Sequence, residues 1–118
     1  MKYTIEGFNQ QNMVNKGLNS NHAVILRWFV DFYATDKMIV VKDSSGKEYR
    51  WVKYQAVIDD LPILGIRSRE VIARYFKQFA EVGILEIYIK KAKTGTYSCF
   101  RIGNEYATLL ESCVRIPL

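Results

Sequence analysis

The 118-residue chain has few of the residue types that build catalytic and metal sites. Histidine occurs once, as His22, and cysteine and proline occur twice each. The two cysteines, Cys99 and Cys113, have neither metal-site nor disulfide-framework spacing, so we expect free, partly buried thiols. The chain also lacks a Gly-Lys-Ser/Thr phosphate loop and a Gly-x-Gly-x-x-Gly motif, which removes the common nucleotide-binding signatures.

The acidic residues do not suggest a catalytic site either. The one adjacent acidic pair, Asp59 and Asp60, falls in a predicted helix, where neighbouring side chains point about 100° apart. His22 lies near the start of a predicted buried helix, where histidine is more often a cap or core residue than a catalyst. We therefore predict that the protein is not an enzyme and that it holds neither cofactor nor metal.

Long apolar runs are absent as well. No stretch approaches the roughly 20 apolar residues of a membrane-spanning helix, and the N-terminus lacks the apolar core of a signal peptide. We expect a cytoplasmic protein with no membrane partner. Hydrophobic residues make up 49% of the chain and charged residues 25%, so residues 1–118 should fold, and their number fits a single domain.

The most informative pattern is a pair of helices joined by a short turn. A first helix is predicted by apolar residues at helical spacing, namely Tyr54, Val57, Ile58 and Leu61. Pro62 prevents it from continuing, and Gly65 suits a tight connection. A second helix is predicted over Ser68 to Gly83, with the Ser68 hydroxyl as N-cap and with one apolar side formed by Val71, Ile72, Tyr75, Phe76, Phe79 and Val82. Two helices with such a turn are typical of a helix-turn-helix, although many helical hairpins share the pattern.

A β-hairpin is predicted directly after the second helix. Apolar and polar residues alternate over residues 85–90, the chain turns through 91–96, and a second strand returns over 97–102. The turn contains Lys91 and Lys93, so the hairpin has a basic tip. In a winged helix-turn-helix, a hairpin in this position is the wing, here residues 84–102, and its tip contacts the phosphate backbone.

Positive charge is concentrated on these two elements. The chain carries 17 basic and 12 acidic residues, a net charge of +5. Eight basic and three acidic residues lie between Arg67 and Arg101, and the nine basic and nine acidic residues elsewhere cancel. The whole net charge therefore belongs to the second helix and its hairpin, as nucleic-acid binding would require. A solvated charged face is the alternative explanation.

Further elements are predicted on either side. Asn19 or Ser20 is expected to cap a core helix over residues 22–34, on which Arg27 and Asp31 can pair one turn apart. A short helix is expected over residues 7–14. After Gly103, Asn104 is expected to cap a final helix, Glu105 to Ser112, whose apolar stripe is Tyr106, Leu109 and Leu110.

A second hairpin is predicted between the core helix and the turn motif, over residues 38–54. Two β-rich arms flank the turn signal Asp43-Ser44-Ser45-Gly46. This hairpin can extend the sheet to which the wing belongs, or it can form a homo-oligomer through its aromatic residues and strand edge. The predicted fold class is therefore α+β, a winged helix-turn-helix with an additional β-hairpin between the first core helix and the turn motif.

Five stretches of the sequence resemble the winged-helix domain at the N-terminus of phage replisome organisers and DnaD-like primosomal proteins. They are Tyr3 to Phe8, Ala23 to Phe29, Tyr49 to Tyr54, Asp60 to Ile66 and Phe76 to Leu85. The resemblance implies DNA binding in phage or prophage-related replication initiation, together with self-association and replication proteins as partners. Family members often carry a further C-terminal domain, so we expect either a short relative or the N-terminal domain of a longer protein.

The resulting functional hypothesis is that the protein binds double-stranded DNA through the second helix and the wing. Arg69 and Arg74 are expected to approach bases, since arginine can donate two hydrogen bonds to guanine. The full set of predicted contacts is Arg67, Ser68, Arg69, Arg74, Lys77, Gln78, Lys90, Lys91 and Lys93. Glu70 and Glu81 share the exposed side of this helix and favour an alternative, a protein-interaction scaffold of the replication machinery. A winged-helix transcriptional regulator is a further alternative with the same DNA surface.

Overall fold

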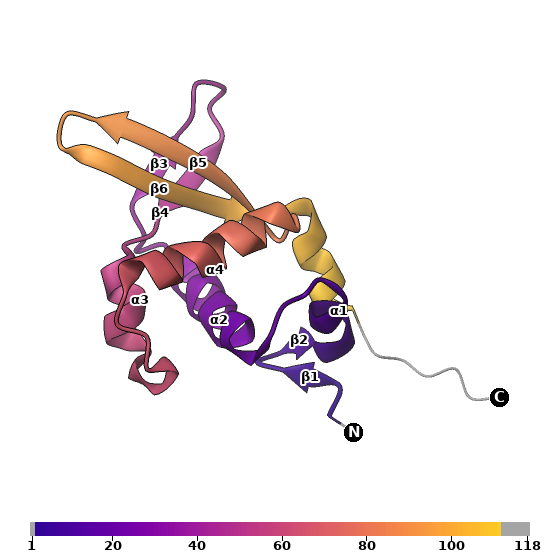
Figure 1. The fold of residues 1–118 in the computed structure, drawn as a ribbon. Coiled ribbons are helices and arrows are strands. Elements are labelled where there is room, and N and C mark those ends of the chain that lie inside the picture. Colours follow the sequence, from indigo (N-terminus) through magenta and orange to yellow (C-terminus); the bar gives the residue numbers. More distant parts are fainter. Residues whose placement is uncertain (1, 112–118) are drawn as a thin grey trace.

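A four-stranded antiparallel sheet of order β3-β4-β6-β5 packs against the helices in the computed structural model, which describes residues 2–111 (Figure 1). A separate two-stranded sheet, β1-β2, lies beside α1 near the N-terminus. The elements are β1 (Thr4–Ile5), β2 (Phe8–Asn9), α1 (Gln10–Asn15), α2 (Ser20–Ala34), β3 (Val40–Lys42), β4 (Glu48–Trp51), α3 (Tyr54–Asp60), the 3₁₀ helix η1 (Pro62–Leu64), α4 (Arg69–Glu81), β5 (Leu85–Ala92), β6 (Gly95–Ile102) and the 3₁₀ helix η2 (Asn104–Leu110). The predicted α+β class is confirmed.

The predicted core helix is α2. The Asn19 side chain accepts from the backbone amides of Asn21 and His22, and the His22 ring in turn accepts from the Asn19 amide, which completes a capping box. Ile25, Leu26 and Phe29 are fully buried. These side chains place α2 at the centre of the core, as the sequence indicates.

Phe76 joins the helices to the sheet. Its ring lies 4.9 Å from Phe100 of β6, 5.8 Å from Tyr54 of α3 and 6.1 Å from Phe29 of α2, measured between ring centroids. These separations are those of favourable aromatic pairs. One buried ring on α4 therefore fixes that helix against the other two core helices and against strand β6.

The hairpin over residues 38–54 extends the main sheet. Its strands β3 and β4 pair in the register Val41↔Tyr49, and β4 pairs onward with β6 in the register Trp51↔Cys99. The Asp43 carboxylate holds the turn by accepting hydrogen bonds from the backbone amides of Ser45 and Lys47, each at 2.9 Å. The sheet-extending role of this hairpin is confirmed.

The expected helix over residues 7–14 is partly wrong. Residues 4–9 form the β1-β2 hairpin, because Glu6 and Gly7 both take positive φ, 55° and 81°, as a tight type I′ turn requires and a helix forbids. The helix begins only at Gln10, where the Asn9 side chain caps it by accepting from the Asn12 amide at 2.9 Å.

The expected final helix, Glu105 to Ser112, is a 3₁₀ helix over Asn104–Leu110 instead, and Gly103 rather than Asn104 precedes it. With three residues per turn, Tyr106 and Leu109 share a face while Leu110 turns outward, where it is 55% exposed. Ser112 and Cys113 lie outside the described residues.

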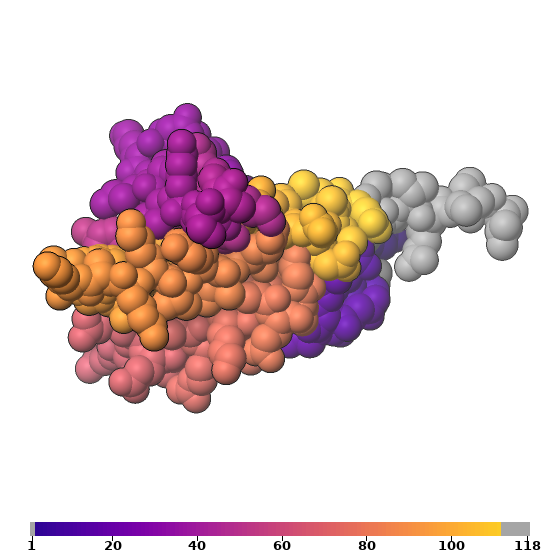
Figure 2. Space-filling model, turned by 90° about the horizontal axis from the view of Figure 1, so that it is seen from above, coloured from indigo at the N-terminus to yellow at the C-terminus, as the bar shows by residue number. Residues whose placement is uncertain are grey.

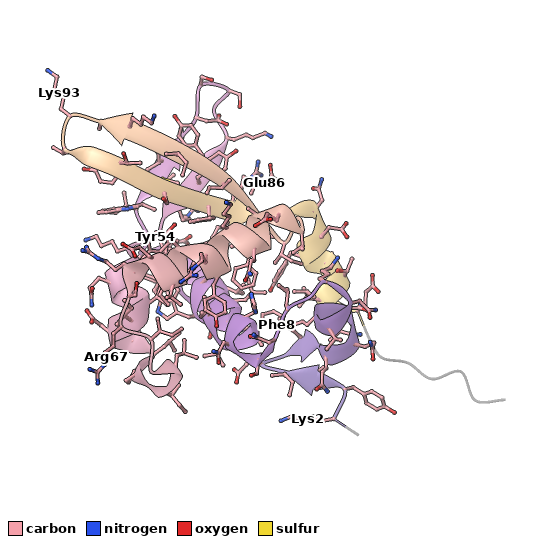
Figure 3. All side chains as sticks on the ribbon, viewed as in Figure 1. Lys2, Phe8, Tyr54, Arg67, Glu86 and Lys93 are labelled. Carbon is pink, nitrogen blue, oxygen red and sulfur yellow. The ribbon has the colours of Figure 1, made fainter. Side chains whose placement is uncertain are left out.

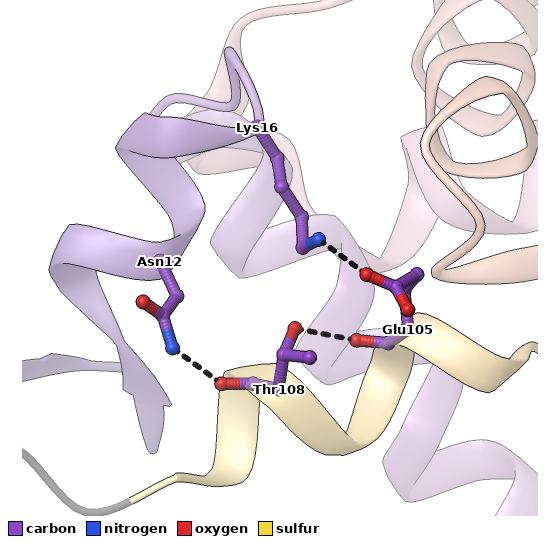
Figure 4. A network of polar contacts seen from close by, with 4 residues as sticks. All are labelled: Asn12, Lys16, Glu105 and Thr108. Carbon is purple, nitrogen blue, oxygen red and sulfur yellow. Dashed lines mark hydrogen bonds and ion pairs between the residues drawn. The ribbon is translucent and has the colours of Figure 1, made fainter.

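Polar contacts bind η2 to α1 (Figure 4). The Asn12 amide donates to the Thr108 carbonyl at 2.7 Å, and the Lys16 ammonium lies 3.0 Å from the Glu105 carboxylate. The Thr108 hydroxyl donates to the Glu105 carbonyl at 2.7 Å within the 3₁₀ helix. The first helix and the last described element of the chain are thereby held together.

Replacing Phe76 with alanine should destabilise the whole domain. Loss of a buried phenylalanine lowers the free energy of unfolding by about 3–5 kcal/mol, because the transfer of its ring is lost and a cavity remains. Ile63→Ala is the control, because Ile63 is 86% exposed and its truncation should change that energy by less than about 0.5 kcal/mol. Urea unfolding followed by circular dichroism measures both values. Equal losses of unfolding free energy in the two variants would contradict the central position of Phe76.

Candidate nucleic-acid interface

Helix α4 presents one charged side to solvent. Ile72, Phe76 and Phe79 are fully buried and fix the orientation of the helix. The remaining polar positions are exposed, namely Arg69, Glu70, Arg74, Lys77, Gln78 and Glu81. Four of these six side chains were predicted as DNA contacts, and two are the carboxylates that favour the alternative of a protein scaffold.

At the C-terminal end of α4 the structure agrees with the sequence prediction, and at the N-terminal end it does not. Gly83 follows the helix with φ 79°, in the left-handed conformation that was expected there. Ser68 occupies the N-cap position, but its side chain makes no capping hydrogen bond, so the predicted role of its hydroxyl is wrong. The Ser68 carbonyl instead accepts from the Val71 amide at 3.2 Å.

Arg67 and Arg69 flank the start of α4. Arg67 is exposed in the loop after η1, and Figure 3 shows its side chain extending into solvent. Arg69 lines a hollow of about 330 Å³ together with Gln55 of α3 and with Thr96 and Ser98 of β6. The hollow therefore connects the start of α4 with the strand that returns from the hairpin tip.

The hairpin β5-β6, which we call the basic hairpin, has longer strands than predicted. The strands pair as far as Ala92↔Gly95, so only Lys93 and Thr94 remain in the turn rather than residues 91–96. Lys93 lies at the tip (Figure 3), which points toward the same end of the molecule as the start of α4 (Figures 1 and 2).

The neighbouring lysines of the basic hairpin lie on opposite faces of the sheet. Lys91 pairs with Thr96, and the same face carries Phe100, which packs on α4. Lys90 pairs with Tyr97, whose ring contacts Trp51 on the other face at 5.0 Å. Side chains alternate along a strand, so Lys91 faces the α4 side and Lys90 faces away from it.

The predicted cations are not paired with carboxylates. Within residues 2–111, no ion pair involves any of the predicted basic contacts, which are Arg67, Arg69, Arg74, Lys77, Lys90, Lys91 and Lys93. The carboxylates nearby on α4, Glu70 and Glu81, are exposed as well. The exposed side of α4, the residues at its start and the hairpin face that carries Lys91 thus form a surface with surplus positive charge, which we call the α4–hairpin surface. Its cations are Arg67, Arg69, Arg74, Lys77, Lys91 and Lys93.

Gln78 is already engaged within the protein. Its side-chain oxygen lies 2.5 Å from Nε2 of His22, which is 3% exposed at the start of α2. Because this contact turns the Gln78 side chain toward α2, we leave Gln78 out of the α4–hairpin surface. The helical pattern could not reveal it, since the partner lies 56 residues away in sequence.

Sequence reasoning also missed several members of this surface. Thr96 and Ser98 lie beside Arg69, and Ile87 and Ile89 are each 42% exposed on the same face of β5 as Lys91. The period-two alternation of β5 and β6 could have assigned these residues to the side of Lys91. It could not show that this side faces α4, because that depends on the packing of Phe100.

The described part of the chain contains neither a metal-binding group of side chains nor a membrane-spanning helix. In residues 2–111, no three His, Cys, Asp or Glu side chains are grouped as a metal site would need. No helix in that same range has the length and apolar character needed to cross a bilayer.

Comparison with protein-family models, curated proteins and solved structures finds no match to this chain.

The contact between His22 and Gln78 predicts a pH-dependent stability. Burial lowers the pKa of His22 below its ordinary value of 6.5, and the hydrogen bond to Gln78 opposes this effect. The unfolded chain therefore binds the proton more tightly, so stability is full above about pH 6.5 and declines as the pH falls below it. We expect the difference in unfolding free energy between wild type and His22→Gln to shrink from pH 7 to pH 5. A difference that stays constant with pH would refute this assignment.

Proposed function

We propose that this protein is a winged helix-turn-helix protein that binds double-stranded DNA through the α4–hairpin surface. The observation that carries the proposal is the surplus of unpaired cations on α4 and on the adjacent basic hairpin. The order of elements supports the fold assignment, since β4 lies between α2 and α3, α4 follows, and the sheet order continues β4-β6-β5. In this assignment α3 and α4 are the helix-turn-helix and the basic hairpin is the wing.

Helix α4 is the recognition helix in this proposal. Arg74 lies in the middle of its exposed side, where it can reach base edges in the major groove. Arg69 lies beside Thr96 and Ser98 of the hairpin. Arg67 and the first amides of the helix face phosphate, which the helix dipole attracts. Lys77 contacts the wall of the groove.

The wing contacts the backbone beside that groove. Lys91 is the lysine of β5 that faces α4, and Lys93 extends the reach of the tip. Lys90 faces the other side of the sheet, so it does not belong to the proposed duplex contact. The exposed Ile87 and Ile89 can pack against sugars between the lysines and α4.

Charge reversal at the wing should weaken binding to every duplex sequence. Each lost phosphate contact reduces the salt slope by about 0.9, so Lys91→Glu/Lys93→Glu should flatten the slope by about 2 and lower affinity at least tenfold. Fluorescence anisotropy with a random duplex across a salt series measures both quantities.

The matched control is Lys2→Glu/Lys42→Glu. It carries the same change in charge on the N-terminal segment and on β3, which is at the opposite edge of the sheet from β5. If both double variants weaken binding equally, only net charge matters and the wing is not a contact.

Glu70 and Glu81 distinguish DNA binding from the alternative of a protein scaffold. Both carboxylates lie on the exposed side of α4, where they repel phosphate if this side faces DNA. Glu70→Gln/Glu81→Gln should therefore raise affinity for a random duplex several-fold in the same anisotropy assay. Unchanged affinity would show that this side of α4 does not face DNA, and it would favour the protein-interaction scaffold.

The biological setting that we propose is replication initiation of the phage replisome organiser type, which rests on the resemblance of the five sequence stretches. Replication proteins and a second copy of the chain, bound through the 38–54 hairpin, are the corresponding proposed partners. The exposed Ile39 and Val40, at 54% and 44%, favour such a contact at the β3 edge.

A transcriptional regulator would use the same DNA surface. Coprecipitation with replication proteins, compared with promoter binding at the protein's own locus, separates the two roles.

A further inference from the structure

The face of the sheet that points away from α4 carries an aromatic cluster. It consists of Tyr49 and Trp51 of β4, Tyr88 of β5 and Tyr97 of β6, and we call it the outer aromatic cluster. The Tyr49 and Tyr88 rings lie 5.3 Å apart and the Trp51 and Tyr97 rings 5.0 Å apart. Together they cover Cys99, which is fully buried although it lies on the outer face. Tyr49 is buried, whereas the other three rings are partly exposed.

Cations surround this cluster. The Lys53 ammonium lies 4.7 Å from the Trp51 ring, and the Arg101 guanidinium lies 5.8 Å from the Tyr49 ring. Lys90 pairs with Tyr97 across the hairpin, which places it on the same face as that ring. The carboxylates on this side are Glu86, which lies 4.0 Å from Lys47, and Asp43, whose oxygen holds the β3-β4 turn. Positive charge is therefore in excess around the rings.

The cluster is continuous with the α4–hairpin surface. Trp51 and Lys53 line the same hollow as Arg69, Thr96 and Ser98. Figure 2 shows the basic hairpin lying between α4 on one side and the β3-β4 hairpin on the other. A nucleic-acid strand that leaves the α4 side can therefore pass through this hollow and reach the aromatic rings.

We propose that the outer aromatic cluster binds single-stranded nucleic acid. Unpaired bases stack on the partly exposed rings of Trp51, Tyr88 and Tyr97, while Lys53, Lys90 and Arg101 contact the phosphates. Aromatic side chains interleaved with cations are the general means of holding single strands, because every unpaired base offers a flat face for stacking. A duplex keeps these faces within its stack, so this surface is distinct from the proposed duplex contact.

The charge of the cluster decides against a second copy of the chain as its occupant. A symmetric dimer through this face would bring two sets of the same cations together, and like charges oppose such an interface. An anionic, aromatic ligand satisfies both features of the surface. Single-stranded nucleic acid supplies phosphate and unpaired bases at once.

Two adjacent lysines on opposite faces of β5 provide a matched test. Fluorescence anisotropy would compare Lys90→Gln and Lys91→Gln on labelled oligo-dT and oligo-U of about 12 nucleotides and on a duplex of similar length. Lys90→Gln should weaken single-strand binding several-fold, flatten its salt slope by about 0.7 and leave duplex binding unchanged. Lys91→Gln should weaken duplex binding and leave single-strand binding unchanged. The dT and U arms show whether DNA or RNA is held more tightly.

Stacking itself is tested through tryptophan fluorescence. Trp28→Phe leaves Trp51 as the sole tryptophan, and its emission should be quenched by oligo-dT but much less by an abasic oligonucleotide of equal charge. Tyr97→Leu, at the end of the cluster nearer the hairpin turn, should reduce single-strand affinity even if Trp51→Leu fails to fold.

Each result supports or overturns a separate claim. Equal loss of single-strand affinity in Lys90→Gln and Lys91→Gln, or equal quenching by the abasic strand, overturns the stacking site. Self-association in light scattering that Lys90→Gln alters, without single-strand binding, assigns the cluster to a second copy instead. Duplex binding without single-strand binding overturns only this inference, and single-strand binding without duplex binding overturns only the proposed function.

Discussion

The packing of Phe76 is the interaction on which the rest of the structure depends. Its ring meets Phe29 of α2, Tyr54 of α3 and Phe100 of β6, so a single side chain of α4 sets the position of this helix relative to three other elements. Because the apolar side of α4 is fixed in this way, its charged side must face solvent. The same contact places Phe100, and with it one face of the basic hairpin, against α4.

That arrangement gives the basic hairpin two chemically different faces. The face that packs on α4 carries Lys91 and two exposed isoleucines, and the opposite face carries Lys90 and the aromatic rings that cover Cys99. The sequence prediction assigned both lysines to the DNA contacts of the wing. The strand separates them, because adjacent residues of a strand point in opposite directions. We therefore propose that duplex and single-stranded ligands bind to opposite sides of one hairpin.

Elements with strong local signals could be predicted from the sequence, whereas features set by distant partners could not. The helical spacing of Ile72, Phe76 and Phe79 predicted α4, and alternation predicted the basic hairpin. The turn at Glu6 and Gly7 was missed because a non-glycine residue seldom takes positive φ, 55° for Glu6. In the candidate site, the exposed cations were predicted individually. The engagement of Gln78 by His22 and the division of Lys90 from Lys91 required tertiary packing and strand register.

The most direct test of the account follows the backbone amides of ¹⁵N-labelled protein during titration with a random duplex and, separately, with oligo-dT. The account predicts that duplex shifts the amide resonances of residues 67–77 and of Lys91 and Thr96, while oligo-dT shifts those of Trp51, Lys53, Tyr88 and Tyr97. Shifts of one shared set of amides with both ligands would contradict the assignment of two faces. Duplex shifts confined to residues 38–50 would contradict the proposed interface itself.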